Sequence, residues 1–287
     1  MMSNVKAYIL SYNTTATANE KWDFGFLKEA FNKKNTEIIN VKQLPNCDRA
    51  FVVIPGPQSV GNEDGISNEL NKIKRVVLFI TGDEEGAFDI EKIIHKNIEI
   101  WIQYPHEKHQ SYNKLPTGTP QHLKENLPSF PIKKDYDIYF AGQITHQRRQ
   151  ELDKAMPTVT NALYMPTAGF TQGDPPKEYY RKLVSAKLAP APSGVIVVDS
   201  FRFYEALEML CLPIADSVRA DGTKDNFWER LFNNKYHGPQ INNWKNLEEV
   251  KQEVLSDYPQ NMHKAVQWWI HYKRDFANKI MEQINES

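Results

Sequence analysis

Short apolar runs alternate with segments of helical spacing along most of the chain, and this alternation constrains the fold more than any other feature. In the first part of the chain the runs are Val5–Ser11, Glu37–Val41, Ala50–Ile54, Arg75–Thr81 and Ile98–Tyr104. Short runs that are apolar throughout are typical of strands covered on both faces. Strands separated by helices form parallel sheets with right-handed crossovers, so the sequence predicts the α/β class.

A proline-rich stretch, Pro105–Pro131, interrupts the pattern, and the alternation then restarts. Apolar runs follow at Asp137–Ala141, Thr158–Leu163, Ala186–Ala191 and Leu212–Ala215. We therefore predict two Rossmann-like domains, one at residues 1–133 and one at 134–262, with a C-terminal helix at about 263–285 that packs back on the first. Ligands of parallel sheets lie beyond the carboxyl ends of the strands, so two such domains facing each other make a ligand cleft.

Composition excludes several classes of protein. The 287 residues are 40% hydrophobic, which is enough for two cores and too much for a disordered chain. The formal charge of -1 gives no global positive field toward nucleic acid. No apolar run approaches the length of a membrane span or a signal peptide, and two distant cysteines are typical of a reducing compartment. We expect a soluble, cytoplasmic protein without a membrane span.

The first candidate site follows the strand at Asp137–Ala141. Gly142 allows a sharp turn or a close approach of a ligand, and a short polar loop then leads to the basic pair Arg148 and Arg149. Backbone N–H groups at a helix start attract phosphate, and either arginine could add charge-assisted bonds to a diphosphate. A plain strand-to-helix turn with solvated arginines is the alternative.

The second candidate site follows the run at 186–191. Ser193–Gly194 forms a turn, Asp199 or Ser200 can cap a helix, and Arg202 and Glu205 share one face of that helix. A cation and a carboxylate beside a helix start suit a nucleotide, with the arginine on phosphate and the glutamate on ribose hydroxyls. The alternative is a capped helix with an ordinary surface ion pair.

Three segments together resemble the donor-binding domain of exostosin-type glycosyltransferases: Tyr180–Gly194, Ser200–Leu207 and Cys211–Ile214. The family patterns are Y-x-x-x-L-x-x-S-K-F-x-L-x-P-x-G, then S-x-R-x-x-E-A-L, then G-C-x-P-V. The resemblance implies the GT-B fold, with two facing Rossmann-like domains and a cleft between them. It also implies transfer of a hexose or pentose from a nucleoside-diphosphate sugar, which we expect to be a UDP-sugar, to a hydroxyl acceptor such as a saccharide.

The resemblance assigns roles to residues of the second site. Glu205 would hold the donor ribose, Arg202 and Ser200 would lie near the diphosphate, and Ser193 and Gly194 would line the nucleotide pocket.

The chain also departs from the family. Ser193 stands where the family carries a basic residue, Leu210 stands where it carries glycine, and Val195–Val198 is an unusually apolar linker between the two motifs.

The first domain should hold the acceptor and the catalytic base. Asp83 and Glu84 follow a buried strand, and a carboxylate there could take the proton of the acceptor hydroxyl in an inverting transfer. The alternative is a glycine-rich turn in which these acids cap the next helix. The loops Pro55–Gly61 and Asn13–Thr15 would lie at the same edge.

No metal is expected. Asp135-Tyr136-Asp137 matches the D-x-D pattern of metal-dependent glycosyltransferases, but it leads into a strand. His106 and His109 lack the spacing of a zinc-protease helix, and we expect them to be solvated.

Two other functions remain open from the sequence. One is glycosylation of hydroxymethylated pyrimidines in phage DNA, and the other is non-catalytic binding of a sugar or nucleotide by a two-domain protein.

Overall fold

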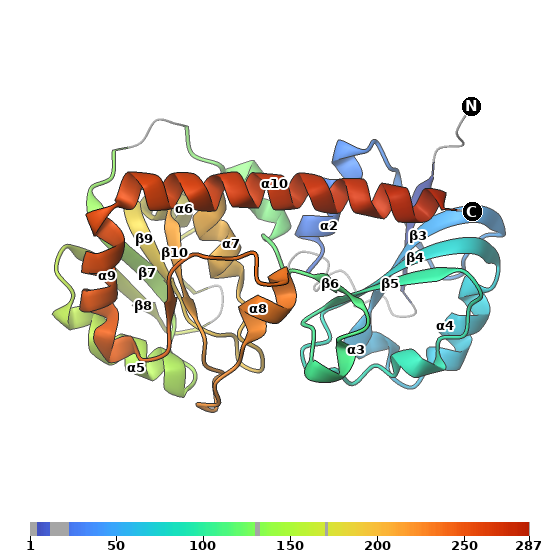
Figure 1. Ribbon diagram of the computed structural model, residues 1–287, viewed down its shortest axis with the longest axis horizontal. Coiled ribbons are helices and arrows are strands. Elements are labelled where there is room, and N and C mark those ends of the chain that lie inside the picture. Colours follow the sequence, from blue (N-terminus) through green and yellow to red (C-terminus); the bar gives the residue numbers. More distant parts are fainter. Residues whose placement is uncertain (1–4, 12–22, 130–132, 170–171, 287) are drawn as a thin grey trace. The chain divides into compact units, whose positions relative to one another are not determined.

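The computed structural model describes residues 5–11, 23–129, 133–169 and 172–286, and the chain divides into two compact units (Figure 1). Unit 1 comprises Met1–Gln121 and His271–Ser287, and unit 2 comprises His122–Ile270. Each unit contains one parallel sheet with helices. The predicted α/β class with two parallel-sheet domains is confirmed.

The sheet of unit 1 has the strand order β2-β1-β3-β4-β5-β6, and every adjacent pair is parallel. Its strands are β1 (Lys6–Leu10), β2 (Ile38–Val41), β3 (Cys47–Pro55), β4 (Ile73–Thr81), β5 (Ile98–Gln103) and β6 (Asn113–Leu115). Each apolar run of the first part of the chain forms one of these strands. The edge strand β6 lies inside the proline-rich stretch and is too short to leave a sequence pattern.

Both faces of this sheet are covered, which explains why its central strands β3 and β4 contain the unbroken apolar runs Ala50–Ile54 and Val76–Ile80. Val52 and Leu78 belong to a core that includes residues of α4, whereas their neighbours Phe51 and Phe79 pack against the ring of Phe31 of α2. The helices of this unit are α2 (Gly25–Lys33), α3 (Gly56–Ser59) and α4 (Glu63–Leu70), with 3₁₀ turns η2 (Ile90–Lys92), η3 (Glu107–His109) and the start of η4 (Gln121–Asn126).

The sheet of unit 2 has the order β11-β10-β9-β7-β8 and is also parallel. Its strands are β7 (Tyr136–Gln143), β8 (Ala162–Thr167), β9 (Ala186–Ala191), β10 (Leu212–Asp216) and β11 (Gln240–Ile241). Pro190 lies inside β9, a position that sheets normally exclude. The pairing of β9 with β7 ends at Leu188, two residues before this proline.

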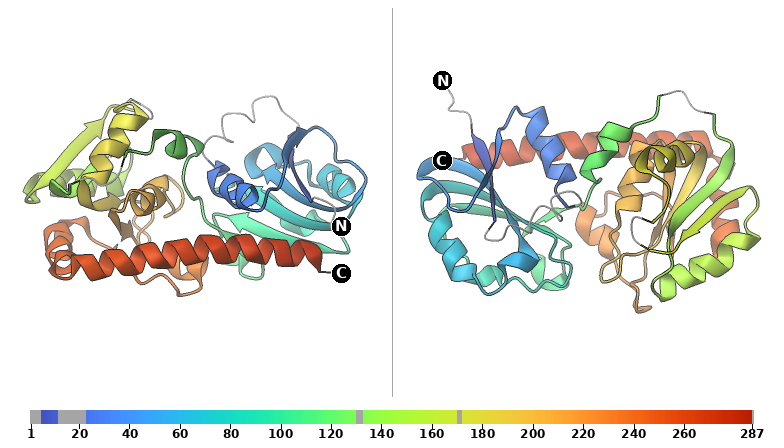
Figure 2. Two further views of the ribbon diagram at one scale, coloured as in Figure 1. Left: turned by 90° about the horizontal axis from the view of Figure 1, so that it is seen from above. Right: turned by 180° about the vertical axis from the view of Figure 1, so that it is seen from behind.

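Helices cover both faces of the second sheet (Figure 2). The chain moves from β7 to β8 in one direction and from β8 through β9 to β10 in the other, so right-handed crossovers place α5 on the face opposite α6 and α7. These helices are α5 (Gln147–Ala155), α6 (Pro176–Val184), α7 (Phe201–Glu208), α8 (Phe227–Phe232) and α9 (Leu247–Ser256), with 3₁₀ turns η5 (Met156–Thr158) and η6 (Trp244–Asn246).

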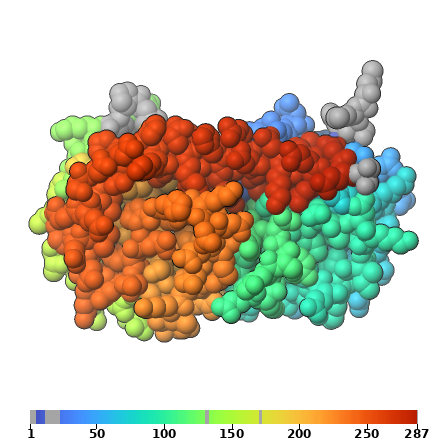
Figure 3. Space-filling view, in the orientation of Figure 1, coloured from blue at the N-terminus to red at the C-terminus, as the bar shows by residue number. Residues whose placement is uncertain are grey.

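The last helix, α10 (Tyr258–Asn285), contributes to both units, and Figure 3 shows its red atoms at the surface. In its first half Trp269 packs against Tyr204 of unit 2. In its second half Phe276 packs against Trp101 and Phe26 of unit 1. One continuous helix therefore supplies core residues to two separate sheets.

Candidate anion-binding site

The strand order of unit 2 defines a switch point between β7 and β9. The chain leaves β7 toward one edge of the sheet and later builds the other edge from β9, so the loops after these two strands diverge. Such a divergence at the carboxyl edge is where open α/β sheets bind ligands. Here it is bordered by the segment 142–146 and by the segment 192–200.

Gly142 and Arg202 meet at this switch point. A Cβ atom on Gly142 would lie 2.2 Å from Nη2 of Arg202, so only glycine leaves room for the guanidinium. Arg202 donates through Nε and Nη2 to the Ala141 carbonyl, both at 3.1 Å, and lies over the ring of Phe140. The two predicted residues are thus brought together.

Arg149 is the second cation of the switch point. It is buried, its Nη1 donates to the Gln143 carbonyl at 3.2 Å, and its Nε has no partner. Burial, and then the charge of Arg202, lower the pKa of Arg149 to about 9, so it is still a cation at neutral pH. In the described part of the chain no carboxylate forms an ion pair with either arginine.

A buried cation beside a second cation is unfavourable unless an anion joins them. The N-termini of α5 and α7, which follow β7 and β9, add partial positive charge at the same edge. The arrangement therefore suits a ligand that carries at least two negative charges close together.

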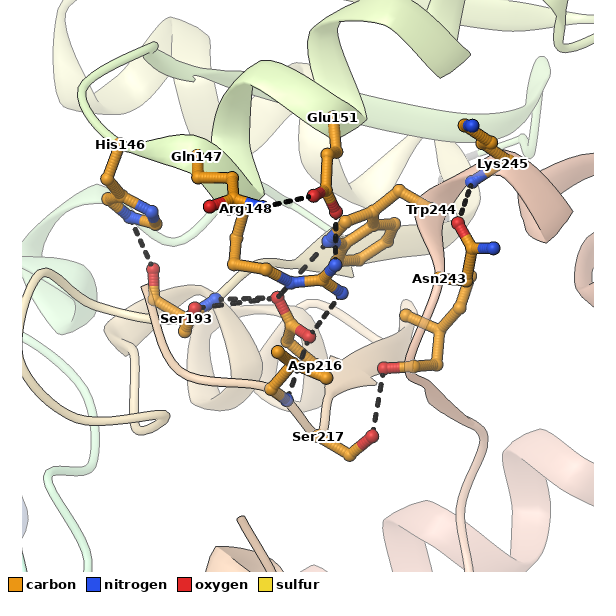
Figure 4. A network of polar contacts seen from close by, with 12 residues as sticks. His146, Gln147, Arg148, Glu151, Ser193, Asp216, Ser217, Asn243, Trp244 and Lys245 are labelled. Atoms are coloured by element: carbon orange, nitrogen blue, oxygen red, sulfur yellow. Dashed lines mark hydrogen bonds and ion pairs between the residues drawn. The ribbon is translucent and has the colours of Figure 1, made fainter. Parts of the chain in front are cut away.

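The other predicted cation, Arg148, has a different role (Figure 4). It is buried and forms a bidentate ion pair with Asp216, with Nη2–Oδ1 at 2.7 Å and Nε–Oδ2 at 3.1 Å, and it also pairs with Glu151. Its guanidinium lies over the ring of Trp244. These bonds engage Arg148 within the protein, and its predicted role on a diphosphate stays a prediction.

Asp216, at the end of β10, is the centre of this network. Its carboxylate also accepts hydrogen bonds from the Trp244 indole at 3.1 Å and the Val218 amide at 3.1 Å, and its carbonyl accepts one from the Trp228 indole. Sequence reasoning missed this residue. The available signal was an acid placed directly after the apolar run Leu212–Ala215, at the carboxyl end of a strand.

Ser193 belongs to the Asp216 network rather than to an open pocket. Its side chain is fully buried and its hydroxyl lies 3.5 Å from Oδ2 of Asp216. The predicted role of Ser193 in lining a nucleotide pocket stays a prediction. Its carbonyl accepts a hydrogen bond from Nε2 of His146 at 3.1 Å, which ties the β9 loop to the start of α5.

His146 lies between the two loops of the switch point. Because a carbonyl only accepts, Nε2 carries the proton, and Nδ1 is buried without a partner. Burial, and then Arg149, lower the pKa of His146 to about 4, so the ring is neutral at pH 7. Its proximity to Arg149 places the β9 loop next to the arginine pair.

The loop after β9 is anchored at both ends. Gly194 packs tightly, since a Cβ there would lie 3.0 Å from the carbonyls of Val197 and Asp199. Ser200 precedes α7 and makes no capping bond through its side chain. The Asp199 carboxylate instead accepts from the Ser200 amide at 2.9 Å and from the Tyr204 hydroxyl at 3.0 Å.

Glu205 is buried between α6 and α7. Its two carboxylate oxygens accept the hydroxyls of Tyr180 at 2.9 Å and Tyr179 at 3.0 Å. Burial, and then Glu205, raise the pKa of Tyr180 far above its ordinary range. These bonds give Glu205 a structural function, and its predicted role on a donor ribose stays a prediction.

In unit 1 the two acids predicted as candidate bases, Asp83 and Glu84, differ in their burial and hydrogen bonds. Asp83 is buried, and its Oδ1 and Oδ2 accept the amides of Ala87 and Phe88, both at 2.9 Å. Asp83 thus holds the turn after β4 and does not cap the next helix, since η2 begins at Ile90 with Asp89 as its N-cap. Glu84 is half-buried, and its carbonyl lies 2.8 Å from Nε2 of His106. The loop Asn13–Thr15 lies outside the described residues.

Of the two histidines expected to be solvated, His106 is half-buried and His109 is buried. His109 is only 4% exposed, and its Nδ1 has no partner. The sequence did not reveal this because the burial comes from packing against His106 and Tyr112 rather than from an apolar period.

Two further observations concern metal ligands and membrane-spanning helices. Among the described residues, no group of three or more histidine, cysteine or acidic side chains has the geometry to hold a metal ion. Asp137 of the D-x-D pattern pairs with Lys187 at 2.7 Å. No helix in the described ranges has both the length and the apolar character that crossing a membrane requires.

One cavity of unit 2 is lined by residues other than those of the switch point. It has a volume of about 680 Å³ and is formed by the segment 235–240, the end of α9 and the first turns of α10. It lacks the cluster of unpaired charges that marks the switch point.

Comparisons with known proteins leave the function open. No protein-family model and no curated protein matches the sequence, so the resemblance to exostosin-type enzymes stays a prediction. A solved structure described as "Crystal Structure of alpha1,3-Fucosyltransferase" resembles this chain with a TM-score of 0.42 and 12% identity, over 94% of this chain and 90% of that one. A likeness at this level carries no argument, and the proposal below rests on the site itself.

Proposed function

We propose that the protein is a glycosyltransferase that moves a sugar from a nucleoside-diphosphate sugar, with UDP as the nucleotide, to a hydroxyl of a saccharide acceptor. The observation that carries the proposal is the Arg149–Arg202 pair at the switch point of unit 2, where two cations lie together without a carboxylate partner among the described residues. A diphosphate supplies the two negative charges that this pair lacks.

The same pair suits the chemistry of the transfer. When the bond between the sugar and the diphosphate breaks, negative charge develops on the leaving diphosphate. Arg149, Arg202 and the amides at the start of α5 and α7 would stabilise that charge without help from a metal. Because Arg149 is buried, water screens its charge less than at an open surface.

The acceptor hydroxyl must lose a proton during attack. We propose that one of the two acids after β4, Asp83 or Glu84, is the base; Asp83 has both carboxylate oxygens engaged by backbone amides, and Glu84 directly follows it in the chain. If the base is Glu84, Glu84→Gln should keep donor binding and lower the rate of transfer.

Replacing Arg149 with methionine tests the anion site directly. Because the replacement removes a buried cation that faces another cation, the unliganded protein should be as stable as the wild type or more stable. Binding of inorganic pyrophosphate and of UDP should weaken at least 10-fold, because a charge-assisted bond is lost. Thermal unfolding and isothermal titration measure the two effects.

The matched control is Arg181→Ala, which removes an exposed arginine that pairs with Glu178 in the same unit. It should leave pyrophosphate binding unchanged. If Arg149→Met instead destabilised the unliganded protein and left pyrophosphate binding intact, Arg149 would be a structural residue and the proposal would fail.

Gly142→Ala offers a second test that keeps both arginines. The new Cβ would displace the flexible end of Arg202 from the Ala141 carbonyl, and the fold should tolerate this movement. Pyrophosphate affinity should fall several-fold with little change in the melting temperature. Unchanged affinity would show that the position of Arg202 does not matter for binding.

A further inference from the structure

The apolar linker after β9 has no function in the site described so far. Val195 and Ile196 are 60% and 39% exposed, whereas Val197 and Val198, the next two residues, are buried. We call Val195 and Ile196 the apolar ledge. Exposed apolar side chains that are held in a fixed loop at a ligand site mark a surface that a ligand covers.

The ledge is rigidly held. Before it, Ser193 is fixed to Asp216, and Gly194 packs against the carbonyls of Val197 and Asp199. After it, the Asp199 carboxylate is fixed by the Tyr204 hydroxyl. A loop anchored on both sides loses little conformational entropy when a ligand binds, so contacts on the ledge contribute to affinity.

The ledge is also close to the arginine pair. Arg149 donates at 3.2 Å to the carbonyl of Gln143, three residues before His146, and His146 donates to the Ser193 carbonyl at 3.1 Å. Val195 is two residues further along, and two residues of chain span at most about 7 Å. The ledge and Arg149 therefore border the same switch point.

We infer that the apolar ledge takes the base of the nucleoside diphosphate whose phosphates lie on Arg149 and Arg202. The inference rests on the proposed function and names the surface that recognises the nucleoside. A base has a flat, weakly polar face that matches two branched apolar side chains. Because the ribose joins the base covalently to the diphosphate, a nucleotide whose diphosphate is bound at the arginine pair brings its base to these side chains. A lipid or a protein segment would need a larger apolar surface than these two residues provide.

The test separates the two halves of the ligand. The double variant Val195→Ser/Ile196→Ser is titrated with inorganic pyrophosphate and with UDP, GDP, CDP and ADP, beside the wild type. The tightest nucleotide should lose about 10-fold in affinity, and pyrophosphate affinity should change less than 2-fold. Both side chains are exposed, so the melting temperature of the unliganded variant should equal that of the wild type.

The control is Ile94→Ser, which removes a side chain that is 74% exposed in unit 1 and should change neither affinity. Equal nucleotide affinity in the double variant and the wild type would contradict binding of the base on the ledge, but would not contradict the anion site. Binding of the base on the ledge would also be contradicted if the wild type bound UDP, GDP, CDP and ADP no more tightly than pyrophosphate. Absence of both pyrophosphate and nucleotide binding in the wild type would overturn the proposed function itself.

Discussion

Asp216→Asn should lower the free energy of unfolding by about 3–5 kcal/mol, the cost of breaking a buried ion pair from one side. The amide would present N–H groups to donors from Arg148, Trp244 and Val218, and Arg148 would become a buried cation without its bidentate partner. Urea unfolding followed by circular dichroism and tryptophan fluorescence measures the loss, since two of the tryptophans bond to Asp216.

A matched control is Asp137→Asn in the same unit. Asp137 pairs with Lys187 at a partly exposed position, where such a pair contributes about 0–1 kcal/mol. A loss at Asp216 no larger than the loss at Asp137 would contradict the central role of the network. The double variant Arg148→Met/Asp216→Leu should recover part of the stability, because neither charge is then left alone.

Acidification from pH 6.5 to pH 4 should destabilise unit 1 through His109. Burial, and then Lys108 and His106, lower the pKa of His109 to about 4, while Asp83 acts in the opposite direction. An unfolded histidine titrates near 6.5, so between these values the unfolded chain binds more protons than the folded one. The stability that His109 contributes is present above pH 6.5 and is lost as the pH falls toward 4, by about 1–3 kcal/mol.

The measurement is a series of urea titrations across this pH range for the wild type and His109→Gln, whose side chain does not titrate. The variant should show a shallower fall in stability. His271→Gln, at an exposed position of α10, should follow the wild type. Parallel curves for His109→Gln and the wild type would show that His109 does not control the acid response.

The sequence was most informative where local pattern and tertiary packing agree. Runs such as Ala50–Ile54 and Arg75–Thr81 became central strands because both of their faces are covered, which is what a run without polar alternation indicates. The strand β6 was missed because three residues added to a sheet edge leave no period to detect.

The candidate site was less predictable because spacing does not reveal partners. Arg148 and Arg149 are neighbours with equal side chains, yet the first pairs with an acid 68 residues away and the second faces another arginine. The difference depends on the position of Asp216 at the end of β10, and the local sequence around the two arginines does not predict that contact. Glu205 likewise found its partners on a separate helix, in Tyr179 and Tyr180.

The shared helix α10 also has a consequence for how the chain is made. Unit 1 needs Phe276 against Trp101 and Phe26, and its Arg75 bonds to the Gln283 carbonyl, yet these partners are translated after every residue of unit 2. The ribosome adds about 5–20 residues per second, so the apolar side chains of unit 1 that α10 covers stay incompletely buried while unit 2 is being translated. Unit 1 can therefore complete its core only after the whole of unit 2 has been synthesised.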